Sequence, residues 1–106
     1  MIQLRPARHW YTVNSAELSK QIATSGGREI VAVLVTGGGA AAAVRLYDSA
    51  FGSGEPSPSA DSFLVSANGG ESTPFCPAHP VLFKKGLYIE LEQGGSSNGE
   101  ATVFYN

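Results

Sequence analysis

The feature that most constrains this chain is its pattern of short apolar runs separated by glycine, serine and proline. These three residue types account for 31 of the 106 residues. Helix interiors tolerate Gly and Pro poorly, whereas short strands joined by turns use them routinely. Turn signals recur about every ten residues, which is typical of small all-β domains. The pattern predicts an all-β, antiparallel β-sandwich, jelly-roll-like or immunoglobulin-like, of about six to eight strands.

The clearest strand pattern lies in the last twenty residues of the chain. Leu87, Ile89 and Leu91 alternate with polar side chains, so that one face of the run is apolar and the other polar. After the loop QGGSSNG, the run EATVFY alternates in the same way. We therefore expect these two segments to pair with each other as an antiparallel hairpin.

A second pair of runs surrounds three consecutive glycines. The segment REIVAVLVT, residues 28–36, is almost continuously apolar and rich in β-branched side chains, which predicts a central strand buried on both faces. The segment AAAAVRLYDS follows, and its alternating end favours a strand over the helix that four alanines suggest. Because glycines permit a tight reversal, we expect a hairpin across Gly37–Gly39.

The remaining segments are shorter or more irregular. Residues 61–67 predict a strand, and residues 73–80, with three prolines, predict an irregular extended segment along a sheet edge. Residues 10–13 are consistent with a strand, while residues 15–23 fit either a short helix or a strand at 18–24. We expect one domain: residues 1–27 form an N-terminal arm or first strand, a possible attachment segment, and residues 28–106 form the sandwich core.

Charge and cysteine content disfavour several classes of protein. Seven Lys and Arg against nine Asp and Glu leave no basic footprint for nucleic acid. No apolar run approaches the ~20 residues that a membrane helix requires, and the first residues do not resemble a secretory signal. With one cysteine, the chain cannot form an intrachain disulfide. We expect a protein that folds in a cytosol and binds neither nucleic acid nor membrane.

The titratable side chains form no convincing catalytic or metal-binding motif. Cys76 and His79 have the spacing of half a zinc site, but His9 is the only other Cys or His in the chain. We interpret Cys76 as a buried thiol beside a surface imidazole. Glu90 and Glu92 share one face of a strand, which indicates a solvated face rather than a pair of catalytic carboxylates. The sequence predicts no catalytic, metal or cofactor site, and hence a protein that is not an enzyme.

Aromatic residues leave two interpretations open. They could form a sugar-stacking platform of the kind that glycan-binding sandwiches use, or they could fill the core and an interface, which is commoner. The aromatic residues in question are Trp10, Tyr11, Tyr47, Phe51, Tyr88, Phe104 and Tyr105. Arginine and tryptophan are enriched at interface hot spots, so the N-terminal segment is a candidate interface with a neighbouring subunit. Its candidate residues are Arg5, Arg8, His9, Trp10 and Tyr11.

Four segments of the chain resemble small all-β proteins encoded among the structural genes of tailed bacteriophages. These segments are VRLYD at residues 44–48, the proline-rich stretch at 75–83, GLYIEL at 86–91 and ATVFY at 101–105. The resemblance covers residues 28–106 and rests on strand and turn patterns. It implies a virion component, above all a capsid decoration (cement) protein, or else a small part of the neck, tail or fibres.

The resemblance also implies where such a chain acts and with what. The expected partners are the major capsid protein or other virion proteins, and further copies of the chain, with a trimer as the favoured homo-oligomer. The expected location is the virion, after synthesis in the cytoplasm of the bacterial host. The resemblance implies no catalytic residue and no cofactor. A glycan-binding sandwich module is the alternative function.

Overall fold

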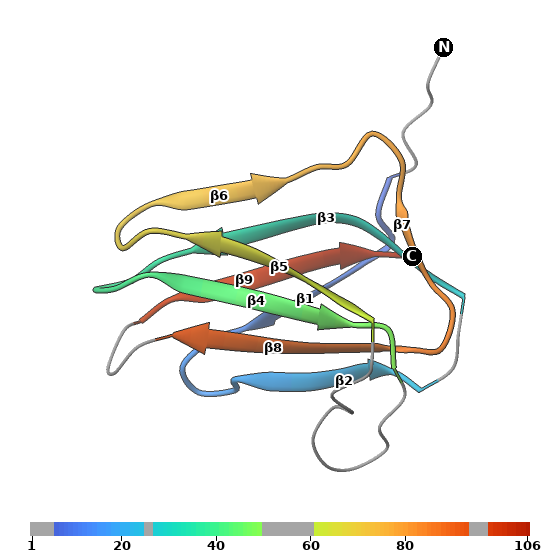
Figure 1. Ribbon diagram of the computed structural model, residues 1–106, viewed down its shortest axis with the longest axis horizontal. Helices are drawn as coiled ribbons and strands as arrows, with labels where there is room; N and C mark the ends of the chain where they lie inside the picture. Colours follow the sequence, from blue (N-terminus) through green and yellow to red (C-terminus); the bar gives the residue numbers. More distant parts are fainter. Residues whose placement is uncertain (1–5, 25–26, 50–60, 94–97) are drawn as a thin grey trace.

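The computed structural model describes residues 6–24, 27–49, 61–93 and 98–106, and the described chain consists of strands and their connections (Figure 1). The strands are β1 (His9–Val13), β2 (Ser19–Ala23), β3 (Arg28–Thr36), β4 (Ala42–Tyr47), β5 (Ser62–Ala67), β6 (Ser72–Phe75), β7 (Val81–Phe83), β8 (Leu87–Gln93) and β9 (Glu100–Tyr105). The described residues thus hold nine strands, one more than the upper end of the expected range.

The strands form two antiparallel sheets that pack face to face. One sheet has the order β1-β9-β3-β6, with the short β7 also paired to β3, and the other has the order β2-β8-β4-β5. Consecutive strands repeatedly fall in opposite sheets, as in a double-sheet jelly roll, and not in the two groups of an immunoglobulin sandwich. The predicted all-β antiparallel sandwich is therefore confirmed, in its jelly-roll form.

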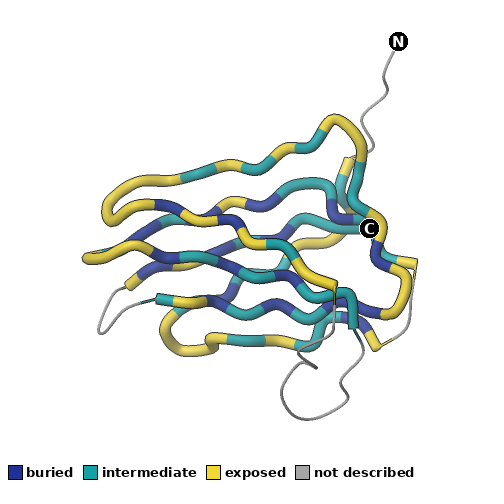
Figure 2. Tube along the Cα trace, viewed as in Figure 1, coloured by how far each residue is buried: buried dark blue, intermediate teal, exposed yellow. Residues whose placement is uncertain are grey.

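The core lies between the two sheets and is built from alternating strand positions. Figure 2 shows buried residues recurring along the central strands, where every second side chain points inward. The largest fully buried side chains include Ile30, Leu46, Leu87 and Ile89. Since burying one such side chain contributes ~1.5–3 kcal/mol, these inward rows are the main source of stability.

The expected hairpin across Gly37–Gly39 is wrong. β3 and β4 belong to different sheets, and the glycines carry the chain from one sheet to the other. At Gly37 the backbone passes so close to Asn68 that a Cβ atom would overlap its carbonyl group. Gly38 also passes close to the backbone of Asn98, so Gly37 and Gly38 are needed for close approach to neighbouring loops and not for a tight reversal within one sheet.

The expected C-terminal hairpin is also wrong. β8 pairs with β2 and β4, whereas β9 pairs with β1 and β3. Both strands do turn their apolar residues inward, as the alternation predicted. The alternation is the same for two strands that pair and for two strands that face each other across a core, so it could not identify the partner.

Both strands that precede β3 belong to the sandwich itself. Residues 19–23 form a strand, which decides between the helix and the strand that the sequence left open. Val13 of β1 and Ala23 of β2 are buried in the core, so the sandwich begins within the segment predicted as an N-terminal arm. β3 is central but not buried on both faces, because Leu34 points outward. β6 is an edge strand, as the prolines predicted.

Candidate interaction surface

Two adjacent rows on the outer face of the β1-β9-β3-β6 sheet carry no charged side chain. Val13, Ala101 and Val103 point inward, so the residues between them on β1 and β9 point outward. The pairing register places these outward residues in continuous rows across the sheet. We call this surface the uncharged face; its residues are Trp10, Thr12, Ala32, Leu34, Pro74, Thr102 and Phe104. The next row, Glu100, Thr36 and Ser72, borders this face and carries the charge of Glu100.

Large apolar side chains on the uncharged face are open to solvent. Trp10 is 67% exposed and lies opposite Phe104 in the register, and Leu34 is 40% exposed beside Pro74. The hydroxyls of this face bond to each other: Thr12 Oγ1 lies 2.8 Å from Thr102 Oγ1. Because these polar groups already have partners, contact with another protein would leave few of them unsatisfied.

The outer face of the other sheet has a different character. On β4 and β8, Arg45 Nε lies 3.4 Å from Glu92 Oε1, and Glu90 is opposite Arg45 in the register. Glu92 is exposed and Glu90 half-buried, which agrees with the predicted solvated face. The rings of Tyr47 and Tyr88 meet edge to face on the same surface, with centroids 5.9 Å apart. Charged side chains thus lie at the middle of this outer face, whereas on the other face Glu100 lies beside the two uncharged rows and not within them.

The structure separates the residues predicted as an N-terminal interface. Arg5 lies outside the described residues. Arg8, His9 and Trp10 are exposed, and the His9 ring lies 5.4 Å from the ring of Tyr105. Of these residues, Trp10 alone belongs to the uncharged face.

Tyr11 points the opposite way from Trp10 and packs against the core. Its hydroxyl donates a hydrogen bond to the Glu17 carboxylate, and this bond raises the pKa of the phenol. The Lys20 ammonium lies 5.7 Å from the centre of the Tyr11 ring. Tyr11 therefore ties β1 to the segment leading into β2 and contributes little to an outward interface.

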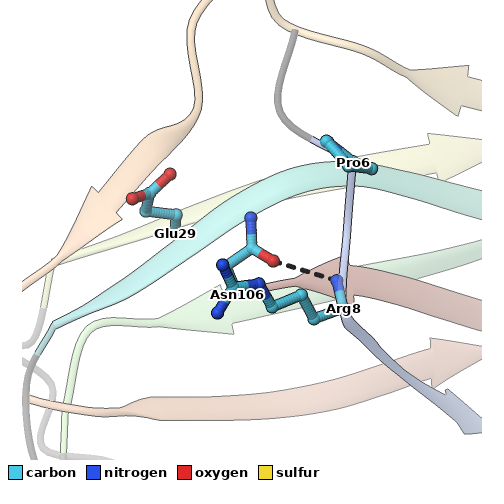
Figure 3. Close-up of a pocket in the computed structure, with 4 residues that line it drawn as sticks. All are labelled: Pro6, Arg8, Glu29 and Asn106. Atoms are coloured by element: carbon cyan, nitrogen blue, oxygen red, sulfur yellow. Dashed lines mark hydrogen bonds between the residues drawn. The ribbon is translucent and has the colours of Figure 1, made fainter.

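Arg8 lines a polar pocket at the end of the same sheet (Figure 3). The pocket has a volume of about 360 Å³ and is lined by Pro6, Arg8, Glu29 and Asn106. The Arg8 backbone N–H donates to Asn106 Oδ1 over 2.9 Å, and Glu29 and Asn106 exchange backbone hydrogen bonds. The pocket brings Arg8 beside residues that are far away in the sequence, so no local sequence motif could predict it.

Asp48 is the described carboxylate with the most backbone contacts, and its role is structural. It accepts hydrogen bonds from the backbone N–H groups of Lys84, Lys85 and Gly86, at 3.1, 2.7 and 3.3 Å. Burial opposes ionisation of this group, but the three N–H donors outweigh burial and lower its pKa. Asp48 thereby fixes the turn that leads from β7 into β8.

The residues with possible metal or redox chemistry do not assemble into a site. Within residues 6–24, 27–49, 61–93 and 98–106, no three His, Cys, Asp or Glu side chains gather where they could hold a metal ion. Cys76 is exposed, so its interpretation as a buried thiol is wrong; it follows the edge strand β6, which has solvent on its outer side. No helix in the described part of the chain is long and apolar enough to cross a membrane.

The sequence-based candidates missed most of the uncharged face. Leu34 and Pro74 were not among these candidates, and Phe104 was selected only as one of seven aromatic residues. The three come from different strands, and only the sheet register brings them together. The available signal was the absence of charge at outward strand positions, which can be read only once the inward positions are known.

Comparison with known proteins gives a distant structural likeness. No family model matches the sequence, and no curated protein matches it. A solved structure of the 3,4-ketoisomerase QdtA from Thermoanaerobacterium thermosaccharolyticum, a double mutant in complex with TDP, is similar with a TM-score of 0.37 and 8% identity. The match covers 93% of this chain and 58% of that one.

That solved structure is an enzyme, which contradicts the expectation that this chain is not one, and we withdraw that expectation. A likeness at this TM-score and identity transfers neither the ketoisomerase reaction nor its ligand to this chain.

Proposed function

We propose that this protein is a bacteriophage capsid decoration protein that binds the major capsid protein through its uncharged face. The resemblance of its strand motifs to phage structural proteins supports this proposal, as does the jelly roll, an architecture that capsid proteins use. Lectins and cupins use the same architecture, so the fold alone does not decide between functions. The choice between these functions therefore depends on the side chains of the two outer faces.

The observation that carries the proposal is the difference between the two outer faces. Interface centres are depleted of charged residues and enriched in aromatic ones, whereas a face that stays in water carries charge. The uncharged face has Trp10 and Phe104 at one side and Leu34 near its middle. The opposite face has Arg45 and Glu92. The molecule therefore has one outer face suited to protein contact and one suited to solvent.

The size of the uncharged face favours attachment in many copies. Four strands ~4.8 Å apart, each contributing about five residues of ~3.4 Å, cover roughly 330 Å². A stable interface buries ~800 Å² per partner. One copy alone would therefore bind weakly through this face, and firm attachment requires further contacts at its rim or linked copies on a repeating lattice.

Such binding would stabilise a capsid by preferential association with the assembled shell. A ligand that binds the assembled state and not the separated subunits shifts the equilibrium toward assembly. A decoration protein that spans neighbouring capsid subunits adds contact area that opposes the pressure of packaged DNA. The chain's own part in this is passive: it supplies a rigid sheet whose outer side chains need no rearrangement.

The test is co-sedimentation of purified protein with capsids that lack it, followed by thermal melting of the capsids. Leu34→Lys should weaken binding by about 100-fold or more, because it buries a charge at the centre of the contact. Leu64→Lys is the matched control, since Leu64 is 45% exposed on the outer face of the other sheet. Binding that survives Leu34→Lys but is lost with Leu64→Lys, or no binding by the unaltered protein, would refute the proposal.

A second candidate function is glycan binding, which is supported by the paired rings of Tyr47 and Tyr88 beside Arg45 and Glu92. Aromatic rings next to charged hydrogen-bonding groups suit sugar recognition. A glycan array with the unaltered protein, Tyr88→Ala and Trp10→Ala tests it. Binding that depends on Tyr88 and not on Trp10 would place a sugar site on this face, and an array without signal would remove the candidate.

A further inference from the structure

We infer that a second copy of this chain pairs its β1 with the open edge of β1, joining two sheets across a twofold axis. Among the strands of the described residues, β1 is the last in its sheet, and β9 is its sheet partner on the other side. This inference concerns association of the protein with itself and does not depend on the proposed binding to a capsid.

The backbone pattern identifies which groups of β1 face outward. Asn106 and Glu29 exchange both of their backbone hydrogen bonds, so Asn106 faces β3. Because direction alternates along an antiparallel strand, Tyr105, Val103 and Ala101 of β9 face β1 instead.

Their register partners on β1 are His9, Tyr11 and Val13, and the alternate residues Trp10 and Thr12 therefore direct their N–H and C=O groups away from the sheet. Asn14, next in the same alternation, confirms it by exchanging backbone hydrogen bonds with Glu17.

One register satisfies all of these outward groups. If the twofold axis passes beside Tyr11, Trp10 of each copy pairs with Thr12 of the other, and both residues exchange hydrogen bonds. Shifting the axis to residue 12 would require Asn14, whose backbone groups are already bonded to Glu17. Shifting it to residue 10 would require Arg8, whose N–H already donates to Asn106.

This register also places no two like charges opposite each other, because His9 of one copy faces Val13 of the other. It places Trp10 of one copy beside Thr12 of the second, so the uncharged face continues across the axis.

β1 lacks the features that block pairing at other edges. β6 carries Pro74, which has no N–H to offer, and β2 has Lys20 and a register shift between Gln21 and Ala23. Natural edge strands are protected by these devices: proline, lysine and bulges. β1 has the sequence HWYTV and pairs with β9 without any shift. Its residues are also strong β-formers.

β5 is likewise unblocked, but its outward residue Leu64 lies beside Arg45 on the charged face. Pairing there would bury less apolar surface, which makes β5 the internal comparison for the test.

The β1 contact is short: five residues span ~17 Å, and such a contact buries less than the ~1,200 Å² of a standard interface. We therefore expect a weak dimer.

Sedimentation velocity from about 10 µM to about 1 mM protein tests the inference, because contacts of this size dissociate at low concentration. The unaltered protein should shift from monomer to dimer across this range. Thr12→Pro removes an outward N–H and should weaken dimerisation about tenfold or more. Leu64→Pro, the equivalent change on β5, should leave it unchanged. A protein that stays monomeric, or a dimer lost with Leu64→Pro and kept with Thr12→Pro, would overturn the inference.

Cross-linking tests the register without a proline. At the twofold axis, residue 11 faces itself in a non-hydrogen-bonded pair with a Cα–Cα distance of ~4.5 Å, which suits a disulfide. In a Cys76→Ser background, Tyr11→Cys should form a covalent dimer under mild oxidation, and Leu64→Cys should not. Cross-linking of Leu64→Cys alone, or of neither variant, would contradict pairing through β1.

Discussion

Asp48 holds the turn that leads into β8, and its replacement by asparagine should reduce stability only where the carboxyl is ionised. The carboxylate accepts three backbone hydrogen bonds, of which the bond from Lys85 is the shortest at 2.7 Å. Hydrogen bonds to charged groups contribute ~1.5–3 kcal/mol each when buried. Asp48 is half-buried and the other two bonds are longer, so we expect Asp48→Asn to lower the free energy of unfolding by about 1–2 kcal/mol at neutral pH.

The loss of stability caused by Asp48→Asn should depend on pH, and the direction of that dependence follows from the pKa of Asp48. The folded state lowers the pKa of Asp48 below its ordinary value of 3.8, so the contribution is fully present above that value. It is lost as the pH falls through the folded-state pKa, because the protonated carboxyl is a poorer acceptor. Urea unfolding of both proteins should show the difference at pH 7 and a smaller one near pH 2.5. A difference that stays constant over this range would refute the assigned role of the carboxylate.

Three further substitutions test the packing and the surface. Leu46→Ala, at a fully buried position, should lower the free energy of unfolding by about 3 kcal/mol in urea titrations, and a loss below ~1 kcal/mol would contradict the described core. Gly86→Ala would place a Cβ 2.6 and 2.7 Å from the carbonyl oxygens of Ser49 and Ala23, so thermal unfolding should show a cost of ~2 kcal/mol or more. Arg45→Ala breaks an ion pair that solvent reaches and should cost less than ~1 kcal/mol; a larger loss in the same assay would show a role beyond that pair.

Strand positions and buried faces could be predicted from the sequence, but strand partners could not. The alternation of Leu87, Ile89 and Leu91 identified the inward face of β8 correctly. It predicted β9 as a sheet partner, whereas β9 lies in the opposite sheet. Period-two alternation records one buried face for each strand and carries no information about which strand lies beside it. The hairpin predicted at the glycines after Thr36 was wrong for a related reason. Glycine is required both in hairpin turns and where two loops approach closely, so its presence does not tell the two apart.

The candidate surface was predictable in part. Trp10 was recognised from its residue type, and the structure places it outward on an edge strand. Tyr11, its neighbour, was grouped with it but points inward, because successive side chains of a strand face opposite ways. Phe104 was selected as an aromatic residue without its place on this face, and Leu34 was not selected at all, since their importance comes from adjacency across β3 and β9. A surface assembled from several strands depends on register, and register depends on the whole fold.

The most direct test of the proposed function is a cryo-EM reconstruction of a phage particle that contains this protein. We expect density for the jelly roll on the capsid surface, with the sheet that bears Trp10, Leu34 and Phe104 turned toward the capsid protein. The face bearing Arg45 and Glu92 should be turned away. A map in which Arg45 and Glu92 contact the capsid while Trp10 and Leu34 face solvent would refute the proposed function, as would a map in which the protein lies away from the capsid surface.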